Sequence, residues 1–355
     1  MMKNIIKSAA IPMRVVGPVK IIGTNINEEV NVPLATFETP LWFSVSRGAK
    51  ISRLCSGIHT VFVKESMTRS ILLEALDAGS ASAFISKLKM MQMEMQTVVA
   101  ASSRFAVLQD FNFQLVGNLI YLRFSFSVGD AAGHNMATKA SEALQNWILQ
   151  KHPELKYVSI SANYCTDKKV SAVNGILGRG KYVIAEMLIP RKICKETLRS
   201  LPDQIVNLNI KKNLIGSILA GSLRSANAHF ANILLAFYLA TGQDAANIIE
   251  GSQGIVHAEL RGDDLYFSVT LPNIIVGTIG NGKELDFVKE NLDLLGCVQT
   301  RKVGENSRRL AEIIAATVLC GELSLLAAQT NMGELMESHI AIERKKQEKT
   351  KAMNN

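Results

Sequence analysis

The feature that most constrains this fold is a run without charged residues between Arg224 and Asp244. The run is long enough to raise the question of a membrane span. It also contains two asparagines, a histidine and a glutamine, which are costly in a lipid bilayer. We therefore predict a core helix, within a stretch rich in Ala, Gly and Leu (213–244) that is typical of closely packed helices.

The chain must supply a core that can bury such a helix. Its 355 residues exceed the length at which a single core usually divides, so two domains are expected. Hydrophobic residues make up 48% of the chain and charged residues 20%, a balance that excludes extensive disorder.

Cysteine usage and the N-terminus indicate the compartment. The five cysteines are scattered without a CxxC pair, which argues against a zinc site or a disulfide framework and suits a reducing cytoplasm. The N-terminal residues include lysines but no sustained apolar segment, so no signal peptide is expected. We predict a cytoplasmic protein that does not enter a membrane.

The net charge of +8 raises the question of a nucleic-acid partner. The basic residues are spread along the chain, however, and the only dense basic stretch lies at 342–351. Aromatic residues make up only 6% and do not alternate with basic ones, so no nucleic acid is expected. The positive charge serves equally well to attract small polyanions such as nucleotides and acyl carriers.

Periodicity divides the chain into two parts. A helical stretch (85–102), an alternating strand (119–128), a helix (133–149) and a returning strand (157–162) predict a small inserted α/β domain. Beyond it come packed helices, a hairpin (255–271) that turns at "RGDD", and two further helices (283–296 and 307–329). The predicted class is α+β: a large, mainly helical domain (1–68 and 161–332) is interrupted by a small α/β domain (69–160), and a helical segment (333–355) ends the chain.

Several familiar motifs are absent or incomplete. "GILGRGKY" (175–182) nearly matches a phosphate-binding loop, but Tyr182 replaces the short hydroxyl and a strand follows, so a glycine turn is expected. "GTIGNG" (277–282) lacks the GxGxxG spacing and also predicts a turn after a strand. The six histidines show no metal-ligand spacing, so no metal site is expected.

Four separated stretches carry side chains suited to catalysis. Glu38 lies in the apolar "VPLATFETP", Lys168 in "SANYCTDKK", Asp244 in "GQDAAN" after the apolar helix, and His339 in "ESHIAIER". Each has a structural alternative: an exposed lysine pair at Lys168, a helix cap at Asp244, an exposed histidine at His339.

These stretches, in this order, resemble the 3-hydroxy-3-methylglutaryl-coenzyme A (HMG-CoA) reductase family, in the form shared by eukaryotes and archaea but without a membrane anchor. The resemblance runs from about Asn4 to His339. The matching stretches are "IPMRVVGPV", "VPLATFE", "MTR", "SSRFAVLQ", "GDAAGHNM", "SANYCTDKK", "IKKNLIGS", "NAHFAN", "GQDAAN", "GTIGNG" and "GENSRRLA…GELSLLAA".

The resemblance implies that the chain reduces the HMG-CoA thioester twice with NADPH, through mevaldehyde, to mevalonate and free CoA. Lys168 matches the lysine that stabilises the oxyanion, and Asp244 matches the aspartate that bonds to this lysine. Glu38 matches the carboxyl that completes the network and donates a proton. His339 matches the histidine that protonates the departing CoA thiolate.

The resemblance also implies binding residues, a ferredoxin-like fold for the small NADPH-binding domain, and a homodimer with active sites at the interface. Those around the HMG portion are Arg69, Ser161, Asn163, Asp167, Lys169, Lys212 and Asn232. Those on the CoA side are Ser44, Arg47, Lys50 and His229. Those on the cofactor side are Ser103, Arg104, Asp130, Ala131, Gly133, Asn135 and Met136, of which Ser103 and Arg104 suit the 2′-phosphate of NADPH.

The chain departs from the family pattern at several positions. Ala132 and His134 stand where methionine is common, which alters the pocket on the nicotinamide side. Thr39 replaces the usual glycine after Glu38, and "GELMESH" replaces the common "GHLVKSH" around His339. Two other functions stay open on the residues alone: a different NAD(P)-dependent acyl-CoA oxidoreductase, and a basic binding protein without enzymatic activity.

Overall fold

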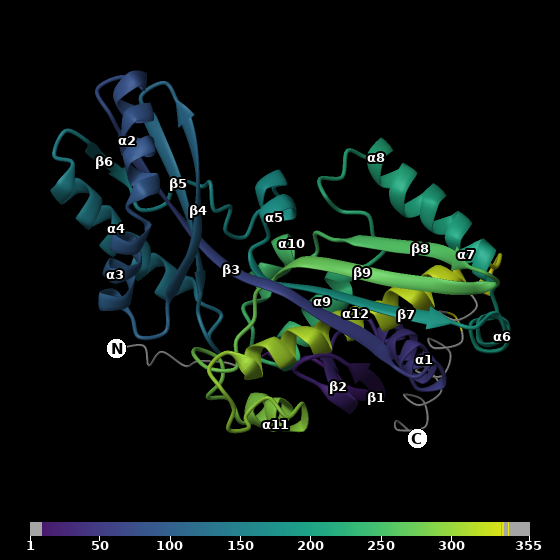
Figure 1. The fold of residues 1–355 in the computed structure, drawn as a ribbon. Coiled ribbons are helices and arrows are strands. Elements are labelled where there is room, and N and C mark those ends of the chain that lie inside the picture. The colour runs from purple at the N-terminus through teal and green to yellow at the C-terminus, as the bar shows by residue number, and fades with distance from the viewer. Residues whose placement is uncertain (1–8, 335, 337–339, 341–355) are drawn as a thin grey trace, which may run out of the picture.

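A single long strand, β3 (Ile58–Glu74), joins the two halves of the molecule. The computed structural model describes residues 9–334, 336 and 340. The N-terminal half of β3 belongs to a larger sheet and its C-terminal half to a smaller one, as Figure 1 shows. The fold is therefore a mixed α/β fold in which one strand crosses between two sheets.

The larger sheet has the strand order β2–β1–β3–β7–β9–β8. Its pairings are antiparallel except for a short parallel contact between β1 and β3, so the sheet is mixed. The predicted hairpin at "RGDD" is confirmed, with Arg261 paired to Asp264 across the turn. The other strands of this sheet are β1 (Met13–Ile22), β2 (Asn27–Ala35), β7 (Gly180–Ile189), β8 (Ile255–Arg261) and β9 (Asp264–Ile274).

One helix, α12 (Glu305–Ala328), forms the centre of this half. It contacts β3, β7 and β9 of the sheet and also packs against α1 (Pro40–Leu54) and α9 (Phe230–Ala240). By length and composition α12 is the one described helix that could cross a membrane, but 94% of its most apolar window is buried in the protein, as expected for a core helix. The charge-free run forms α9, whose buried face confirms the predicted core helix.

The smaller sheet has the order β6–β3–β5–β4, and all of its pairings are antiparallel. Its elements follow one another as β–α–β–β–α–β, with the two helical segments supplied by α2 and α3 and by α4. Figure 1 shows these helices together beside the sheet. The elements are β4 (Val107–Val116), β5 (Leu119–Ser127), β6 (Lys156–Ser159), α2 (Ala78–Met90), α3 (Gln92–Ser102) and α4 (His134–Lys151).

Short helical segments complete the larger half. They are α5 (Ala172–Leu177), α6 (Arg191–Ile193), the π-helix η1 (Cys194–Leu198), α7 (Pro202–Leu208), the π-helix η2 (Asn209–Gly216), α8 (Ser217–Leu219), the 3₁₀-helix η3 (Ala245–Asn247), α10 (Ile248–Gly251) and α11 (Asp286–Leu294). Two of them, η2 and α8, reach into the stretch rich in Ala, Gly and Leu (213–244), where closely packed helices were predicted.

The buried apolar side chains form two clusters, one under each sheet. The part predicted to be mainly helical is in fact built around six strands, and the pattern in β1 and β2 did not reveal them. In β2 the reason is a polar start: the strand begins with three exposed polar residues and buries its apolar side chains only from Val30 towards Ala35. The predicted helix at 85–102 is two helices, α2 and α3, because Met91 leaves the helical backbone region.

Candidate active site

The loop between β6 and α5 holds an unusual backbone. Three of its residues that are not glycine have positive φ angles: Asn163 at 57°, Thr166 at 46° and Lys168 at 55°. Such angles cost free energy for side chains with a Cβ, and they persist only where surrounding contacts enforce them. Here the Cys165 amide donates to Ser70 Oγ at 3.0 Å, and Asn174 Nδ2 donates to the Thr166 carbonyl at 3.1 Å. The loop is therefore held in a fixed, strained shape.

This shape presents Lys168 to Asp244. Lys168 Nζ lies 2.6 Å from Asp244 Oδ2, and the two side chains are 40% and 45% exposed. The hydrogen bond to Asp244 raises the pKa of Lys168, against the effect of partial burial. Burial acts to raise the pKa of Asp244, but the hydrogen bonds from Lys168 and from the Ala246 amide outweigh it and leave that pKa lowered. The pair is therefore a stable ammonium–carboxylate pair at neutral pH.

Asp244 has both of the roles considered from the sequence. Its Oδ1 accepts a hydrogen bond from the Ala246 amide at 3.1 Å and so caps the single turn of η3. Its Oδ2 binds the lysine. The cap fixes the carboxylate on the backbone, so the direction in which it meets Lys168 is set by η3.

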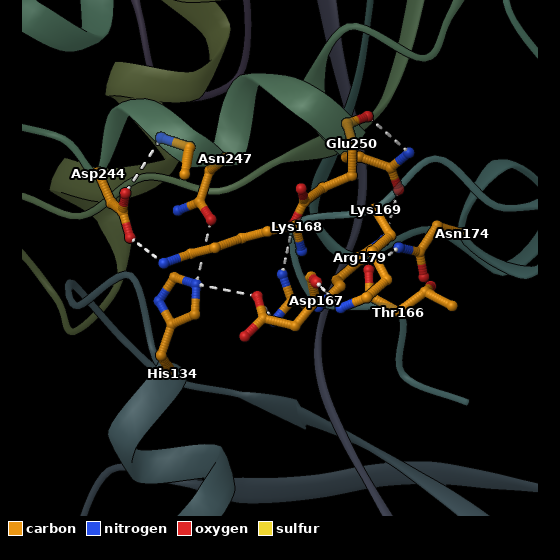
Figure 2. Close-up of polar contacts among 12 residues, drawn as sticks. His134, Thr166, Asp167, Lys168, Lys169, Asn174, Arg179, Asp244, Asn247 and Glu250 are labelled. Atoms are coloured by element: carbon orange, nitrogen blue, oxygen red, sulfur yellow. Dashed lines mark hydrogen bonds and ion pairs between the residues drawn. The ribbon is translucent and has the colours of Figure 1, made fainter. Parts of the chain in front are cut away.

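A buried ion pair supports the loop, and Figure 2 shows its two side chains, Arg179 and Glu250, close to Asp167 and Lys168. Arg179 Nη1 lies 2.7 Å from Glu250 Oε1, and neither side chain is exposed. The same Glu250 oxygen accepts a hydrogen bond from the Lys168 amide at 3.0 Å, and Arg179 Nη2 lies 2.9 Å from Asp167 Oδ1. The backbone of Lys168 and the side chain before it are thus both tied to one buried pair.

Arg179 belongs to the segment that nearly matches a phosphate-binding loop. "GILGRGKY" is a turn from α5 into β7, as predicted, with Gly178 and Gly180 at φ angles of 77° and 86°. A Cβ at Gly180 would lie 2.5 Å from the Ile274 carbonyl oxygen, so the turn needs glycine there. This turn delivers Arg179 into the protein interior under the loop.

Glu38 lies in a separate group of polar residues. It is exposed between β2 and α1, and its Oε2 accepts a hydrogen bond from Asn232 Nδ2 at 2.8 Å. Among the described residues, no hydrogen bond or ion pair joins Glu38 or Asn232 to Lys168 or Asp244. Two of the four predicted catalytic residues therefore bind each other directly in one chain, and His339 is outside the described residues.

The predicted CoA-side residues gather along α12. Ser44 Oγ lies 3.4 Å from the Gly321 carbonyl, and Arg47 Nε donates to Ser324 Oγ at 2.9 Å. His229 Nδ1 lies 2.6 Å from Glu322 Oε1, a buried carboxylate that also accepts from the backbone amides of residues 228 and 229. Lys50 is exposed on α1.

The predicted residues of the HMG portion have partners in different parts of the fold. Arg69 Nε donates to Thr138 Oγ1 of α4 at 2.9 Å. Lys169 Nζ donates to the Asp167 carbonyl at 3.0 Å, and Ser161 is exposed at the start of the loop. Lys212 Nζ donates to Asn213 Oδ1 at 3.1 Å, and burial lowers the pKa of Lys212 although Glu322 opposes the shift.

A pocket of about 330 Å³ opens where α3 ends beside α4. Its lining includes three of the residues predicted for the cofactor side, Ser103, Arg104 and Met136, and also Lys139, which the sequence analysis missed. Lys139 lies one helical turn after Met136 in a predicted helix, and this spacing was the signal that could have identified it. The pocket combines two cations with a hydroxyl, a set suited to a phosphate group.

Asp130 has a structural task at the same end of the small sheet. Its Oδ2 accepts from the Gly304 amide and its Oδ1 from the Ser307 amide, each at 2.9 Å, so it caps the N-terminus of α12.

Ala131 forms a bridge to Ile279 of "GTIGNG", which is a turn as predicted. Gly133 is the N-cap before α4 with a φ of 96°, and a Cβ there would lie 2.5 Å from Val128 Cγ2. Asn135 is exposed.

No cluster of three or more His, Cys, Asp or Glu side chains that could hold a metal ion occurs in the described part of the chain.

The family model described as "Hydroxymethylglutaryl-coenzyme A reductase" matches residues 1–344 of this chain. The chain belongs to the hydroxymethylglutaryl-coenzyme A reductase family. Among curated relatives, the 3-hydroxy-3-methylglutaryl-coenzyme A reductase of Aeropyrum pernix is 43% identical over 339 residues, covering 95% of this chain and 80% of that protein. Reductase 2 of Dictyostelium discoideum is 41% identical over 350 residues, covering 97% of this chain and 65% of that protein.

The fold of the family is also found in solved structures. The class II reductase from Streptococcus pneumoniae, in a structure bound to NADPH in open conformations, has a TM-score of 0.73 at 20% identity and covers 93% of this chain and 87% of that one. The chain is thus an oxidoreductase of the reductase family, and the polar groups described above lie on a fold that the family shares.

Proposed function

We propose that this reductase converts HMG-CoA to mevalonate and CoA with two molecules of NADPH. The observation that carries the proposal is the Lys168–Asp244 pair on the strained loop, in a chain of this family. Each NADPH supplies one hydride. The first hydride reduces the thioester carbonyl, loss of CoA leaves mevaldehyde, and the second hydride reduces the aldehyde to the alcohol.

The Lys168 ammonium stabilises the oxygen of the carbonyl that is being reduced. Hydride addition turns this oxygen into an alkoxide, and a preformed cation at that point stabilises the transition state more than the ground state. Asp244 keeps the lysine charged and oriented, and the buried Glu250–Arg179 pair fixes the backbone that carries it. We assign Glu38 as a proton donor in this network and His339 as the acid for the CoA thiolate.

The first prediction concerns pH. Asp244 raises the pKa of Lys168 above its ordinary 10.5, so the lysine stays charged until the pH passes that raised value. In Asp244→Asn the anion is lost, the pKa of Lys168 should fall, and the alkaline decline in kcat/KM should move to lower pH. Asp286→Asn, at an exposed aspartate of α11, is the control and should leave the profile unchanged. An Asp244→Asn profile that declines at the wild-type pH would show that Asp244 does not set the charge of Lys168.

We assign NADPH to the small domain (69–160), with its 2′-phosphate at Ser103, Arg104 and Lys139. The pocket between α3 and α4 supports this assignment because it places two cations and a hydroxyl together. We assign the remaining cofactor contacts to the segment from Asp130 to Met136 and the substrate to the large domain (1–68 and 161–332). The segment 333–355 is proposed as the flap that brings His339 to the substrate.

The second prediction concerns the cofactor. Arg104→Ala should raise the KM for NADPH about tenfold or more, because a hydrogen bond to a charged group contributes about 1.5–3 kcal/mol. The KM for NADH, which lacks the 2′-phosphate, should change little. Lys87→Ala, at an exposed lysine of α2, provides the control. Equal increases for both cofactors would remove the phosphate assignment.

We also propose a cytoplasmic homodimer whose active sites lie at the interface. Within the described residues of one chain, no hydrogen bond or ion pair joins Glu38 to the Lys168–Asp244 pair, so a second chain could complete the network. Apolar side chains along η2 and α8 are exposed, namely Ile215, Ile218 and Leu219 at 49%, 77% and 82%. Sedimentation at micromolar concentration should give a dimer, and an active monomer would contradict the proposal.

The overall reaction is tested by the absorbance of NADPH with HMG-CoA as substrate. Oxidation of two NADPH per mevalonate formed is expected. Oxidation with other acyl-CoA thioesters but not with HMG-CoA would indicate a different acyl-CoA oxidoreductase, and no oxidation with any thioester would favour a binding protein.

A further inference from the structure

The side chain of His134 lies inside the polar cluster around Lys168. It is the first residue of α4 and follows the left-handed Gly133, at a position where methionine is common in the family that the sequence resembles. Figure 2 shows its ring between the Lys168–Asp244 pair on one side and Asp167 on the other. The side chain is 21% exposed.

One ring nitrogen of His134 lies near two side chains, each of which is close in sequence to one member of the Lys168–Asp244 pair. Its Nε2 lies 3.3 Å from Asn247 Oδ1 and 3.7 Å from Asp167 Oδ1. Both oxygens are acceptors, so Nε2 carries the hydrogen and donates to Asn247. Asn247 stands three residues after Asp244, and Asp167 is the residue before Lys168. A single imidazole therefore contacts one near neighbour of each member of the pair.

The contact to Asn247 is the one that fixes the turn. Asn247 is fully buried, and its side chain has no other hydrogen-bond partner within the described part of the chain. It ends η3, the turn that Asp244 caps. If the donor at position 134 is lost, the whole Asn247 amide is left buried without a partner, at a cost of about 1–3 kcal/mol per unsatisfied group. The turn can avoid this cost only by moving, and Asp244 would move with it.

Burial of the His134 ring, more than the charges around it, favours its neutral form near pH 7. Burial and then the Arg179 cation lower the pKa of His134 below 6.5, and Lys168 acts in the same direction, while Asp167 and the hydrogen bond to Asn247 oppose the shift. The charged side chains that face it are Asp167 and Lys168 from the loop, Arg179 from the turn before β7 and Asp244 from η3. A neutral ring with a hydrogen on Nε2 fits the hydrogen bond to Asn247.

We propose that His134 is a positioning residue for the reduction, which orients Asp244 through its hydrogen bond to Asn247. The inference rests on the proposed function, because it assigns the effect to the reaction at Lys168. It also ties the start of α4, on the cofactor side of the site, to the loop on the substrate side.

Two variants separate the hydrogen bond from the bulk of the ring. Glutamine places a neutral N–H near the position of Nε2, whereas methionine fills similar space without a donor. His134→Met should lower kcat about tenfold to a hundredfold with both HMG-CoA and mevaldehyde, as a misplaced catalytic group does. His134→Gln should restore most of that loss. The KM for NADPH should stay near the wild-type value in both.

His257→Met, at a histidine of β8 whose side chain is 56% exposed, is the matched control and should be fully active. A wild-type kcat in His134→Met, or equal losses in the methionine and glutamine variants, would overturn the proposal. A higher KM for NADPH in both variants would instead make His134 a cofactor contact and would also overturn it.

A measurement without turnover keeps this inference separate from the proposed function. Nitrogen NMR of the imidazoles in the wild-type protein, assigned by the signal missing in His134→Gln, should show His134 as the neutral tautomer with hydrogen on Nε2. The tautomer with hydrogen on Nδ1 would overturn the proposal even in an active enzyme. If the wild-type protein does not reduce HMG-CoA, the proposed function fails, whatever the tautomer.

Discussion

Lys168→Ala should lower kcat about 10²–10³-fold with HMG-CoA and with added mevaldehyde, as the loss of one preorganised oxyanion donor does. Both reductions form an alkoxide at the position that Lys168 stabilises, so the rates of both should fall. The Asp244 carboxylate would also lose its cation, which adds to the effect. Stopped-flow absorbance of NADPH, with each substrate at saturation, measures the two rates separately.

Lys169→Ala is the matched control for this prediction. Lys169 is the next residue, is exposed, and its side chain donates a hydrogen bond to the Asp167 carbonyl. We assign it to the carboxylate of the substrate, so its loss should raise the KM for HMG-CoA and leave kcat largely unchanged. A Lys168→Ala enzyme that turns over mevaldehyde normally would make Lys168 a structural residue, and the site assignment would then be wrong.

Arg179→Met should lower the free energy of unfolding by about 3–5 kcal/mol, because it leaves the buried Glu250 carboxylate without its cation. The loop carrying Lys168 should lose its support as well, since the Lys168 amide and Asp167 both bind this ion pair. Urea unfolding followed by circular dichroism measures the stability. Activity at low denaturant should fall before the global transition.

Two comparisons test the cause of this loss. Lys289→Met breaks an exposed ion pair of α11 and should change stability by no more than about 1 kcal/mol. The double variant Arg179→Met, Glu250→Gln removes the unpaired charge and should recover part of the stability lost in the single variant. A single variant as stable as the wild-type protein would mean that the buried pair contributes nothing to the fold.

Local patterns were sufficient to predict several elements of the fold. The charge-free run is the core helix α9, the "RGDD" turn joins β8 to β9, and both glycine-rich motifs are turns. Each of these features depends on residues close together in the chain. A turn needs glycine where φ is positive, and a helix without charge is stable only where it is buried.

The resemblance to the reductase family directed attention to Lys168 and Asp244, and the structure brings those two side chains together. It did not indicate what holds them there. Arg179 occurred in a motif that was set aside, and Glu250 follows Asp244 by a few residues without any local signal. Their contact depends on the turn before β7 and on α10, which are far apart in the chain.

The division of β3 between two sheets, and the place of His134 beside Lys168, were decided only by the tertiary structure. Strand pairing joins segments through backbone groups that every residue has. The side-chain pattern of β3 therefore does not predict which strands it pairs with in either sheet. The sequence by itself determined which segments are apolar, where the chain turns and which residues could carry the chemistry. Which buried charges meet, and which histidine lies among them, follows from packing of distant segments, because burial makes an unpaired polar group costly wherever it lies in the chain.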